Sequence, residues 1–381
     1  MEWLVLLRDG KSEVMTLRSS RSGSEPIRIA LLTSGGDAPG MNACIRAVVK
    51  GSSIQQVVPN PVQVIGFKHG VRGLARHFDD DVKELRGADV SGIIGSGGTI
   101  LGTSRADAIY EFLLQTKPEL IADGYPIELL LEQEWVIDLL GSEALDIVRT
   151  LAIDGLVFIG GDQTCTAAFD LSEASAGEIP IIVIPASIDN DIEGIGESVG
   201  FDTAVQAAVS AVDAIRTTAA SHSRIFIIES MGKDQGHIAV EVALACGAEE
   251  VLVPEENYSV EDIDSLIHRL VESRQTGRES ALIIVAEGVK PGAWAQTTSI
   301  DRSAATELEA AIRERLKKWN ERTWEVRVDV IGHLQRGTAP THRSRNNGSR
   351  LGLAVVDELL TVIAVNSGLI LPEITDLKFP R

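Results

Sequence analysis

The sequence predicts an α/β protein with two lobes, in which mostly parallel sheets are flanked by helices. Short apolar runs rich in β-branched residues alternate with helix-like segments, a pattern typical of parallel sheets covered on both faces. Several of these runs end in turns rich in glycine or aspartate, as expected where a ligand meets the carboxyl ends of parallel strands. The chain has 381 residues, 44% of them hydrophobic and 24% charged, which is enough for two domains with a sizeable core.

The composition is strongly acidic. Lys and Arg number 35 against 55 for Asp and Glu, a formal net charge of -20, which argues against a nucleic-acid or anionic-membrane surface. The apolar runs are far shorter than the roughly 20 residues of a membrane helix, and the run at 3–7 is too short for a secretory signal. We therefore expect a cytoplasmic protein. The three cysteines have no ligand-like spacing, and for Cys44 and Cys165 we expect core packing.

The first glycine-rich turn follows a predicted strand at 27–33. The segment SGGDAPG at 34–40 separates this strand from a predicted helix at 41–50. Such a turn exposes backbone N–H groups and the positive end of a helix dipole, where a phosphate can sit. It is neither a P-loop, because no Gly-Lys-Ser/Thr closes it, nor a dinucleotide fingerprint. Taken alone, it is equally compatible with an ordinary tight turn.

A second turn of this kind follows a predicted strand at 155–159. The segment GGDQT at 160–164 leads into a helix-like stretch at 167–172. The two glycines remove side chains where a nucleotide would approach, and Asp162 stands at the carboxyl end of the strand. Mg²⁺ is the natural partner of such an acid beside phosphates, because it keeps most of its waters and takes one or two carboxylates.

A third segment, PASIDND at 185–191, follows the apolar run at 181–184. Asp189 and Asp191 are two residues apart, so an extended or turning backbone points both carboxylates to one side. One could hold a metal or accept a proton while the other orients, which suits phosphoryl transfer. For this segment alone, an Asp/Asn-rich turn without catalytic role is the simpler interpretation.

Together with six further segments, these turns make the chain resemble the phosphofructokinase family. The matching segments run in family order from about residue 27 to residue 352, which is most of the chain. They are LTSGGDAPGMNA, GGTILGTSR, IGGD, SIDNDI, VGFDTA, SHSR, MGK, VAEGV and IGHLQRG. Any one could arise by chance, but nine in order are very unlikely to.

The resemblance implies a two-lobed phosphofructokinase-like fold. Residues 1–26 would be an N-terminal extension, 27–198 with 337–381 a donor-binding lobe, and 199–336 a sugar-phosphate-binding lobe. Within the donor lobe, 109–149 is an acidic, leucine-rich insertion, longer than the family usually has there, for which we expect helical or hairpin structure.

The second lobe is predicted from the same alternation of patterns. A helix is expected at 203–220 and strands at 225–229, 281–286 and 327–331. The segment 351–362 then returns the chain to the first lobe.

The resemblance also implies a reaction: phosphorylation of fructose 6-phosphate at its 1-hydroxyl with ATP and Mg²⁺, a step of glycolysis. Asp189 would be the general base, and Asp191 would hold the constellation through the metal or its waters. Ser187 would bond the transferred phosphoryl group. Lys233 completes the catalytic set, together with Arg105, which would neutralise developing charge. The donor-binding residues implied are Gly36, Arg105, Gly161, Asp162, Gln163 and Thr164, with Asp162 as the metal ligand.

On the sugar side, the resemblance assigns the hydroxyls of fructose 6-phosphate to Glu287 and the Met231-Gly232 turn. His333 and Arg336 would bind its 6-phosphate, for which the guanidinium fork is well suited. Arg224 and Arg327 would reach into a neighbouring subunit's site, which implies a homo-oligomer, most often a dimer of dimers. The full substrate-binding set is Ser187, Asp189, Arg224, Met231, Gly232, Lys233, Glu287, Arg327, His333 and Arg336.

Departures from the family pattern leave alternatives open. ATP users of the family have glycine at both position 163 and position 186, where this chain has Gln163 and Ala186. Pyrophosphate users have aspartate at the first of these positions and lysine at the second. We favour ATP, because pyrophosphate without a lysine at 186 loses a compensating cation. Lys233 replaces an arginine and loses its planar fork, so we expect slower turnover. The segment 337–345 also differs, which leaves room for another sugar phosphate such as sedoheptulose 7-phosphate.

The effector positions of the family are partly matched, and an allosteric enzyme is therefore expected. Arg46, Arg216, Arg278 and Glu255 fit them, whereas Lys50 replaces an arginine. A pyrophosphate-dependent enzyme and a catalytically weak or regulatory subunit remain the alternatives. Lipid and NAD kinases also use a Gly-Gly-Asp turn, but they would not need the GHLQRG segment.

Overall fold

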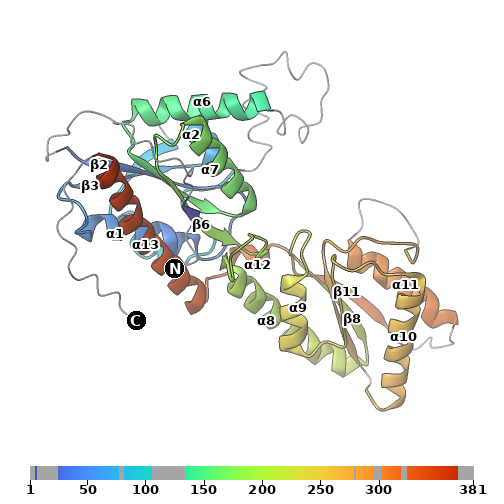
Figure 1. Cartoon of the computed structure of the whole chain (residues 1–381). Helices are drawn as coiled ribbons and strands as arrows, with labels where there is room; N and C mark the ends of the chain where they lie inside the picture. Colours follow the sequence, from blue (N-terminus) through green and yellow to red (C-terminus); the bar gives the residue numbers. More distant parts are fainter. Residues whose placement is uncertain are drawn as a thin grey trace. The chain divides into compact units, whose positions relative to one another are not determined.

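The computed structural model divides the chain into two compact units (Figure 1). Unit 1 consists of Met1–Ser187, Ile192–Gly200 and His342–Arg381, and unit 2 of Ile188–Asp191 and Phe201–Thr341. The residues that the structure describes are 5–6, 25–76, 81–104, 134–278, 280–295, 303–318 and 324–367.

Within the described residues, unit 1 is built on a seven-stranded sheet. Its strand order is β1-β6-β5-β2-β3-β4, and β7 pairs with β6. Two strands pair antiparallel with their neighbours: β1 with β6 and β4 with β3. All other pairs in the sheet are parallel. The strands are β1 (Val5–Leu6), β2 (Ile27–Thr33), β3 (Val62–Phe67), β4 (Val82–Leu85), β5 (Gly155–Gly160), β6 (Ile181–Ser187) and β7 (Val199–Gly200). The predicted class, α/β with mostly parallel sheets, is confirmed.

Helices cover both faces of this sheet (Figure 1). The central strands are continuous apolar runs, and every residue of β5 and β6 is buried, as a parallel sheet covered on both faces requires. One face carries α2 (Gly70–Arg76), α6 (Glu134–Thr150) and α7 (Asp162–Ala174), and the other α1 (Met41–Ile54) and α13 (His342–Asn366); a short 3₁₀ turn, η2 (Ile93–Gly95), lies beside α1.

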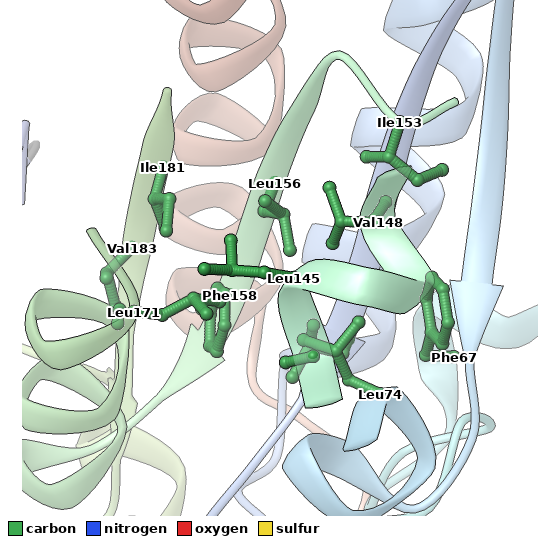
Figure 2. Packing of buried hydrophobic residues seen from close by; sticks show 14 residues of the cluster. Phe67, Leu74, Leu145, Val148, Ile153, Leu156, Phe158, Leu171, Ile181 and Val183 are labelled. Atoms are coloured by element: carbon green, nitrogen blue, oxygen red, sulfur yellow. The ribbon is translucent and has the colours of Figure 1, made fainter. Parts of the chain in front are cut away.

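The core under α2, α6 and α7 is drawn in Figure 2. Alternate residues of β5, Leu156 and Phe158, point into it, as the two-residue period of a strand dictates. Helix α6 adds Leu145 and Val148, both buried. This helix is the described part of the predicted insertion, so the expected helical structure is found there, and it is a core element; residues 109–133 lie outside the described ranges.

On the opposite face, α13 packs closely along α1 because α13 carries glycines at the contact. A Cβ atom on Gly352 would lie 2.7 Å from the Cβ of Ala47, and one on Gly348 would lie 3.0 Å from Cys44 Sγ. Burial raises the pKa of the Cys44 thiol to about 12, so this group stays neutral. The core-packing role predicted for Cys44 is confirmed.

Unit 2 has a smaller sheet with four parallel strands among its described residues, in the order β11-β8-β10-β9. Helices α8, α9 and α12 lie on one face, and α10 and α11 on the other (Figure 1). The elements are α8 (Phe201–His222), β8 (Ile225–Ser230), α9 (His237–Cys246), β9 (Glu250–Leu252), α10 (Val260–Gln275), β10 (Ala281–Ala286), α11 (Ala304–Lys318), β11 (Val326–Val330) and α12 (Leu334–Gly337). The strands and the long helix predicted for this region are confirmed to within one or two residues.

A capping box starts α10: Ser259 and Asp262 exchange side-chain and backbone hydrogen bonds, which fixes where the helix begins. None of the described helices combines the length and apolarity needed to cross a bilayer.

We expect Phe158→Ala to lower the free energy of unfolding of unit 1 by about 3–5 kcal/mol, because it removes a ring that is 1% exposed and leaves a cavity. The matched control is Phe169→Ala on α7, where the ring is 47% exposed and the change should stay within about 0.5 kcal/mol. Urea unfolding of both variants measures the difference, and equal losses would contradict this core.

Candidate active site

The carboxyl ends of β2, β5 and β6 meet at one edge of the unit 1 sheet, because these strands are parallel neighbours. Strand β2 leads into Gly36, β5 leads through Gly161 into Asp162 at the start of α7, and β6 ends at Ser187. We call this set of residues, 34–37, 160–164 and Ser187, the glycine-loop edge. Tertiary structure thus brings three segments predicted separately to one place.

Hydroxyl groups tie the loops of this edge together. Thr164 Oγ1 donates to the carbonyl of Ser34 at 3.1 Å, and Thr103 Oγ1 donates to the carbonyl of Gly35 at 2.6 Å. The amide of Gly35 in turn donates to the carbonyl of Ser104 at 3.3 Å. Ser104 directly precedes Arg105, which lies outside the described residues, so the segment leading to Arg105 is fixed at this edge.

Two further side chains hold the 96–104 loop. Asn42, 1% exposed on α1, donates to the carbonyls of Ser96 and Gly97 at 3.2 Å each and accepts from the amide of Ile100 at 2.8 Å. Thr33 donates from Oγ1 to the carbonyl of Gly102 at 2.7 Å. Sequence reasoning missed both residues; the available signal was a polar group inside an otherwise apolar strand or helix face.

The two glycines of the second loop have different roles. A Cβ atom on Gly160 would lie 2.5 Å from the carbonyl oxygen of Ser34 and would also clash with Thr164, so this glycine is required by packing. A Cβ atom on Gly161 would meet Ser187 Cβ at an ordinary 3.5 Å. Packing therefore requires glycine at 160 but not at 161, and the space beside Gly160 is filled by the protein. Gln163 is exposed, whereas Thr164 is 1% exposed.

The residues of this edge fit a magnesium ion whose ligands are mainly water and phosphate oxygens. Asp162 is the acid in the first turn of α7 and is partly exposed. The described residues contain no group of three or more His, Cys, Asp or Glu side chains placed to hold a metal. Mg²⁺ commonly binds one or two carboxylates and completes its shell with water and phosphate oxygens. Asp162 can supply such a carboxylate.

In unit 2, the carboxyl ends of β8, β10 and β11 likewise meet at one edge, which we call the unit 2 edge. Strand β8 leads into the turn Met231–Lys233, and β10 into Glu287. Glu287 Oε1 accepts from the amides of Gly232 at 3.1 Å and Lys233 at 2.9 Å, while Gln335 Oε1 accepts from the amide of Met231 at 2.9 Å. Side chains therefore satisfy three successive backbone donors of the turn.

The turn is tight. Gly232 has φ 148°, and a Cβ atom on it would lie 2.6 Å from the carbonyl oxygen of Gln235, so only glycine fits. Lys233 has φ 53°, a left-handed conformation that is unfavourable for a residue with a long side chain. Its Nζ lies 3.8 Å from Asp191 Oδ2. The conformation thus brings the lysine and one of the two predicted carboxylates together.

The segment 188–191 belongs to unit 2 by its contacts. His237, the first residue of α9, bonds through Nδ1 to the carbonyl of Asp189 at 3.2 Å, and Nδ1 is the donor because a carbonyl only accepts. Asn190 has φ 56°, a left-handed conformation that asparagine tolerates well. The segment 188–191 is therefore an Asp/Asn-rich turn, and this turn also carries the two paired acids, Asp189 and Asp191.

The pKa of Asp189 is raised to about 6, mainly by burial; the neighbouring carboxylates of Asp191 and Glu287 contribute to the rise, whereas Arg336 and Lys233 oppose it. Among the charged neighbours, Arg336 has the largest influence, and this arginine is only 8% exposed. A carboxyl group that titrates near neutral pH beside two cations is suited to accept a proton from a hydroxyl.

The other predicted arginines lie elsewhere. His333 directly precedes α12, at the same edge as Arg336, but Arg224 directly precedes β8 and Arg327 is the second residue of β11. Both therefore lie at the amino-terminal edge of the sheet, where each pairs with Glu325. At about 3.3 Å per residue, the length of β8 separates Arg224 from the unit 2 edge of its own chain by about 20 Å, and the rest of β11 separates Arg327 from it by about 10 Å.

Three of the predicted effector residues lie in unit 2. Arg216 donates to the carbonyl of Gly247 at 3.2 Å, and Arg278 to Glu249 Oε1 at 2.9 Å, so both contact the connection between α9 and β9. Glu255 Oε1 accepts from the amide of Gly236 at 2.8 Å, before α9 begins.

Two α/β units, a glycine-loop edge with a carboxylate at a strand end and a second carboxyl group of raised pKa form an arrangement suited to phosphoryl transfer. The chain belongs to the phosphofructokinase family: the family model described as Phosphofructokinase matches residues 28–359.

Curated relatives cover nearly the whole chain. It is 40% identical over 333 residues to "ATP-dependent 6-phosphofructokinase 1" of Thermus thermophilus, and 38% identical over 333 residues to "ATP-dependent 6-phosphofructokinase" of Lysinibacillus sphaericus; in both cases 87% of this chain and 86% of the relative are covered.

Solved structures show the same fold. The phosphofructokinase of Saccharomyces cerevisiae matches 88% of this chain and 42% of its own, with a TM-score of 0.66 at 26% identity. This chain thus spans about two fifths of the yeast chain. A pyrophosphate-dependent phosphofructokinase from Nitrosospira multiformis matches 88% of this chain and 77% of its own, with a TM-score of 0.67. At 17% identity, this second likeness shows the fold alone.

The raised pKa of Asp189 predicts a stability effect. A carboxyl group whose pKa is about 6 when folded and about 3.8 when unfolded binds its proton more tightly in the folded protein. Stability should therefore fall as pH rises from about 4 to 6, and the loss is fully present above pH 6.

Asp189→Asn should remove this loss, and it should raise the stability of unit 2 at pH 8 by up to about 3 kcal/mol, the equivalent of the shift at 1.36 kcal/mol per unit. Denaturant unfolding at pH 8 and at pH 4 measures it. The gain should vanish at pH 4, and an equal gain at both pH values would contradict the buried-carboxyl explanation.

Proposed function

We propose that this chain is an ATP-dependent 6-phosphofructokinase, which transfers the terminal phosphoryl group of ATP to the 1-hydroxyl of fructose 6-phosphate in the presence of Mg²⁺. The observation that carries the proposal is the buried Asp189 carboxyl group, with a pKa of about 6, beside Arg336 and Lys233. The names of curated relatives at 38–40% identity support the donor and the substrate.

Asp189 accepts the proton of the sugar 1-hydroxyl as the hydroxyl oxygen attacks the terminal phosphorus. The new oxygen–phosphorus bond forms while the bond to the leaving oxygen breaks, and ADP departs. Lys233 and Asp191, 3.8 Å apart, orient each other beside this base. Ser187 bonds the transferred group; only Ile188 separates it from Asp189, so the covalent chain keeps their Cα atoms within about 7 Å.

The sugar is held by the unit 2 edge. Glu287 and the Met231-Gly232 turn bind its hydroxyls, and His333 with Arg336 binds its 6-phosphate. The donor phosphates are held by Gly36, Gly161, Gln163 and Thr164 and by Arg105. When bound, Mg²⁺ would neutralise charge on these phosphates, and Asp162 would be its protein ligand.

ATP is the proposed donor in preference to pyrophosphate. Ala186 lies in β6 with 0% exposure, and its methyl group supplies no cation where pyrophosphate users carry lysine. The reaction is a step of glycolysis, whose metabolites are cytoplasmic, and we place the enzyme there. We assign the donor to the lobe 27–198 with 337–381 and the sugar phosphate to the lobe 199–336, with which the segment 188–191 makes its contacts.

The enzyme is proposed to act as a homo-oligomer, a dimer of dimers. The support is the position of Arg224 and Arg327 at the amino-terminal edge of the unit 2 sheet, away from the sugar-binding residues of their own chain. In the proposed assembly, these arginines complete a neighbouring subunit's site.

We expect purified protein to form fructose 1,6-bisphosphate from ATP and fructose 6-phosphate, and to lose this activity when Mg²⁺ is chelated. Asp189→Asn should lower kcat by a factor of about 10² to 10⁴ with little change in the KM for fructose 6-phosphate, because the general base is lost. A coupled assay with ATP and with pyrophosphate measures these effects.

The control for that assay is Asp170→Asn on α7, which should leave kcat unchanged. A preference for pyrophosphate would replace the proposed donor. Sugar-phosphate binding without turnover by either donor would identify a regulatory subunit instead, and an unaltered kcat in Asp189→Asn would remove the base.

Subunit mixing tests the shared site. Asp189→Asn lacks the base but keeps Arg224, and Arg224→Ala lacks the arginine but keeps the base. If Arg224 acts on a neighbour, a refolded mixture of the two inactive variants should regain activity, because one site of each hybrid pair has both groups. Activity no greater than the sum of the separate variants would contradict this arrangement.

A further inference from the structure

Gln335 lies inside unit 2, in one of the two segments that the proposed function assigns to the sugar phosphate. It belongs to the one-turn helix α12, flanked by His333 and Arg336, and its side chain is 0% exposed. Neither the motif pattern nor the proposed mechanism gives it a role. A fully buried primary amide needs partners for both its ends.

Both ends of the amide have partners. Gln335 Oε1 accepts from the amide of Met231 at 2.9 Å, and Nε2 donates to the carbonyl of Ala204 on α8 at 3.4 Å. The backbone partners determine the orientation of the side-chain amide, because Met231 N–H can only donate and the Ala204 carbonyl can only accept. Among neutral side chains of this length, only glutamine offers one acceptor and one donor at these positions.

The Met231 amide needs this acceptor because it lies beyond the sheet. This amide faces β11, and the ladder between β8 and β11 ends at the pair Glu229 and Val330, so Met231 has no strand partner there. The following two amides of the turn are bound by Glu287. The turn is therefore held on one side by Glu287 and on the other by Gln335.

We propose that Gln335 is a positioning residue for the sugar phosphate, which holds the Met231–Lys233 turn in place relative to the His333–Arg336 segment. This inference rests on the proposed function, in which the turn binds the sugar hydroxyls and the segment binds the 6-phosphate. The two groups of contacts lie on different elements, β8 and α12, and the amide joins them directly. Without the Gln335 amide, the distance between the turn and the His333–Arg336 segment would no longer be fixed. The hydroxyls and the 6-phosphate of one sugar phosphate could then not contact both groups equally well.

The test is the KM for fructose 6-phosphate in Gln335→Leu, which can neither accept nor donate. We expect this KM to rise about tenfold, the equivalent of one hydrogen bond, while the KM for ATP stays within about twofold. Gln335→Met carries the same expectation if the leucine variant does not fold. Gln335→Glu keeps an acceptor for the Met231 amide and should recover most of the affinity.

The matched control is Gln206→Leu on α8, where the amide is exposed and bonds to Ser210 of the same helix; both KM values should be unchanged. Parallel changes in the two KM values, or a glutamate variant no better than leucine, would overturn the role of Gln335 while leaving an active wild-type enzyme. A wild-type chain that does not turn over fructose 6-phosphate overturns the proposed function itself.

Discussion

Parallel strand pairing is the constraint on which the glycine-loop edge of unit 1 and the unit 2 edge each depend. It places the carboxyl ends of neighbouring strands at one edge, where the ladder stops and backbone groups need other partners. In unit 1, hydroxyls such as those of Thr103 and Thr164 supply these partners and tie the glycine loops together. In unit 2, Glu287 and Gln335 do the same for the turn after β8. Polar side chains at these ends thus have a structural role of their own.

The unit 2 edge places two cations near Asp189, although the chain as a whole is strongly acidic. The protein carries a formal charge of -20, yet the influential cations around Asp189 are Arg336 and Lys233. Burial and two neighbouring carboxylates outweigh these cations, and the pKa of Asp189 stays raised. A site of this kind costs stability, which the apolar cores of the two units must offset. The burial and the like charges that raise the pKa of Asp189 therefore cost stability, although one of those charges, Glu287, also binds the turn after β8.

Much of the fold could be predicted because its strands are long apolar runs that end in distinctive turns. The strands at 27–33 and 281–286 were predicted with the bounds that the structure has. The insertion was harder, because leucines in an acidic passage fit a surface hairpin as well as a core helix. Only packing on the sheet shows that Leu145 and Val148 belong to the core. Asn42 and Gln335 were missed, because a buried amide has no signal in a single sequence beyond its own polarity.

The sequence by itself determined the class of fold, the three ligand-type turns and the family resemblance, since local patterns of glycine, aspartate and apolar residues are sufficient for each. Tertiary structure decided which of those residues share an edge. It placed Arg336 beside Asp189 and left Arg224 and Arg327 at the opposite edge of the same sheet. It also set the pKa of Asp189. The physical reason is that burial and the distances between charges depend on residues far apart in the chain, and a linear pattern does not record their separation in space.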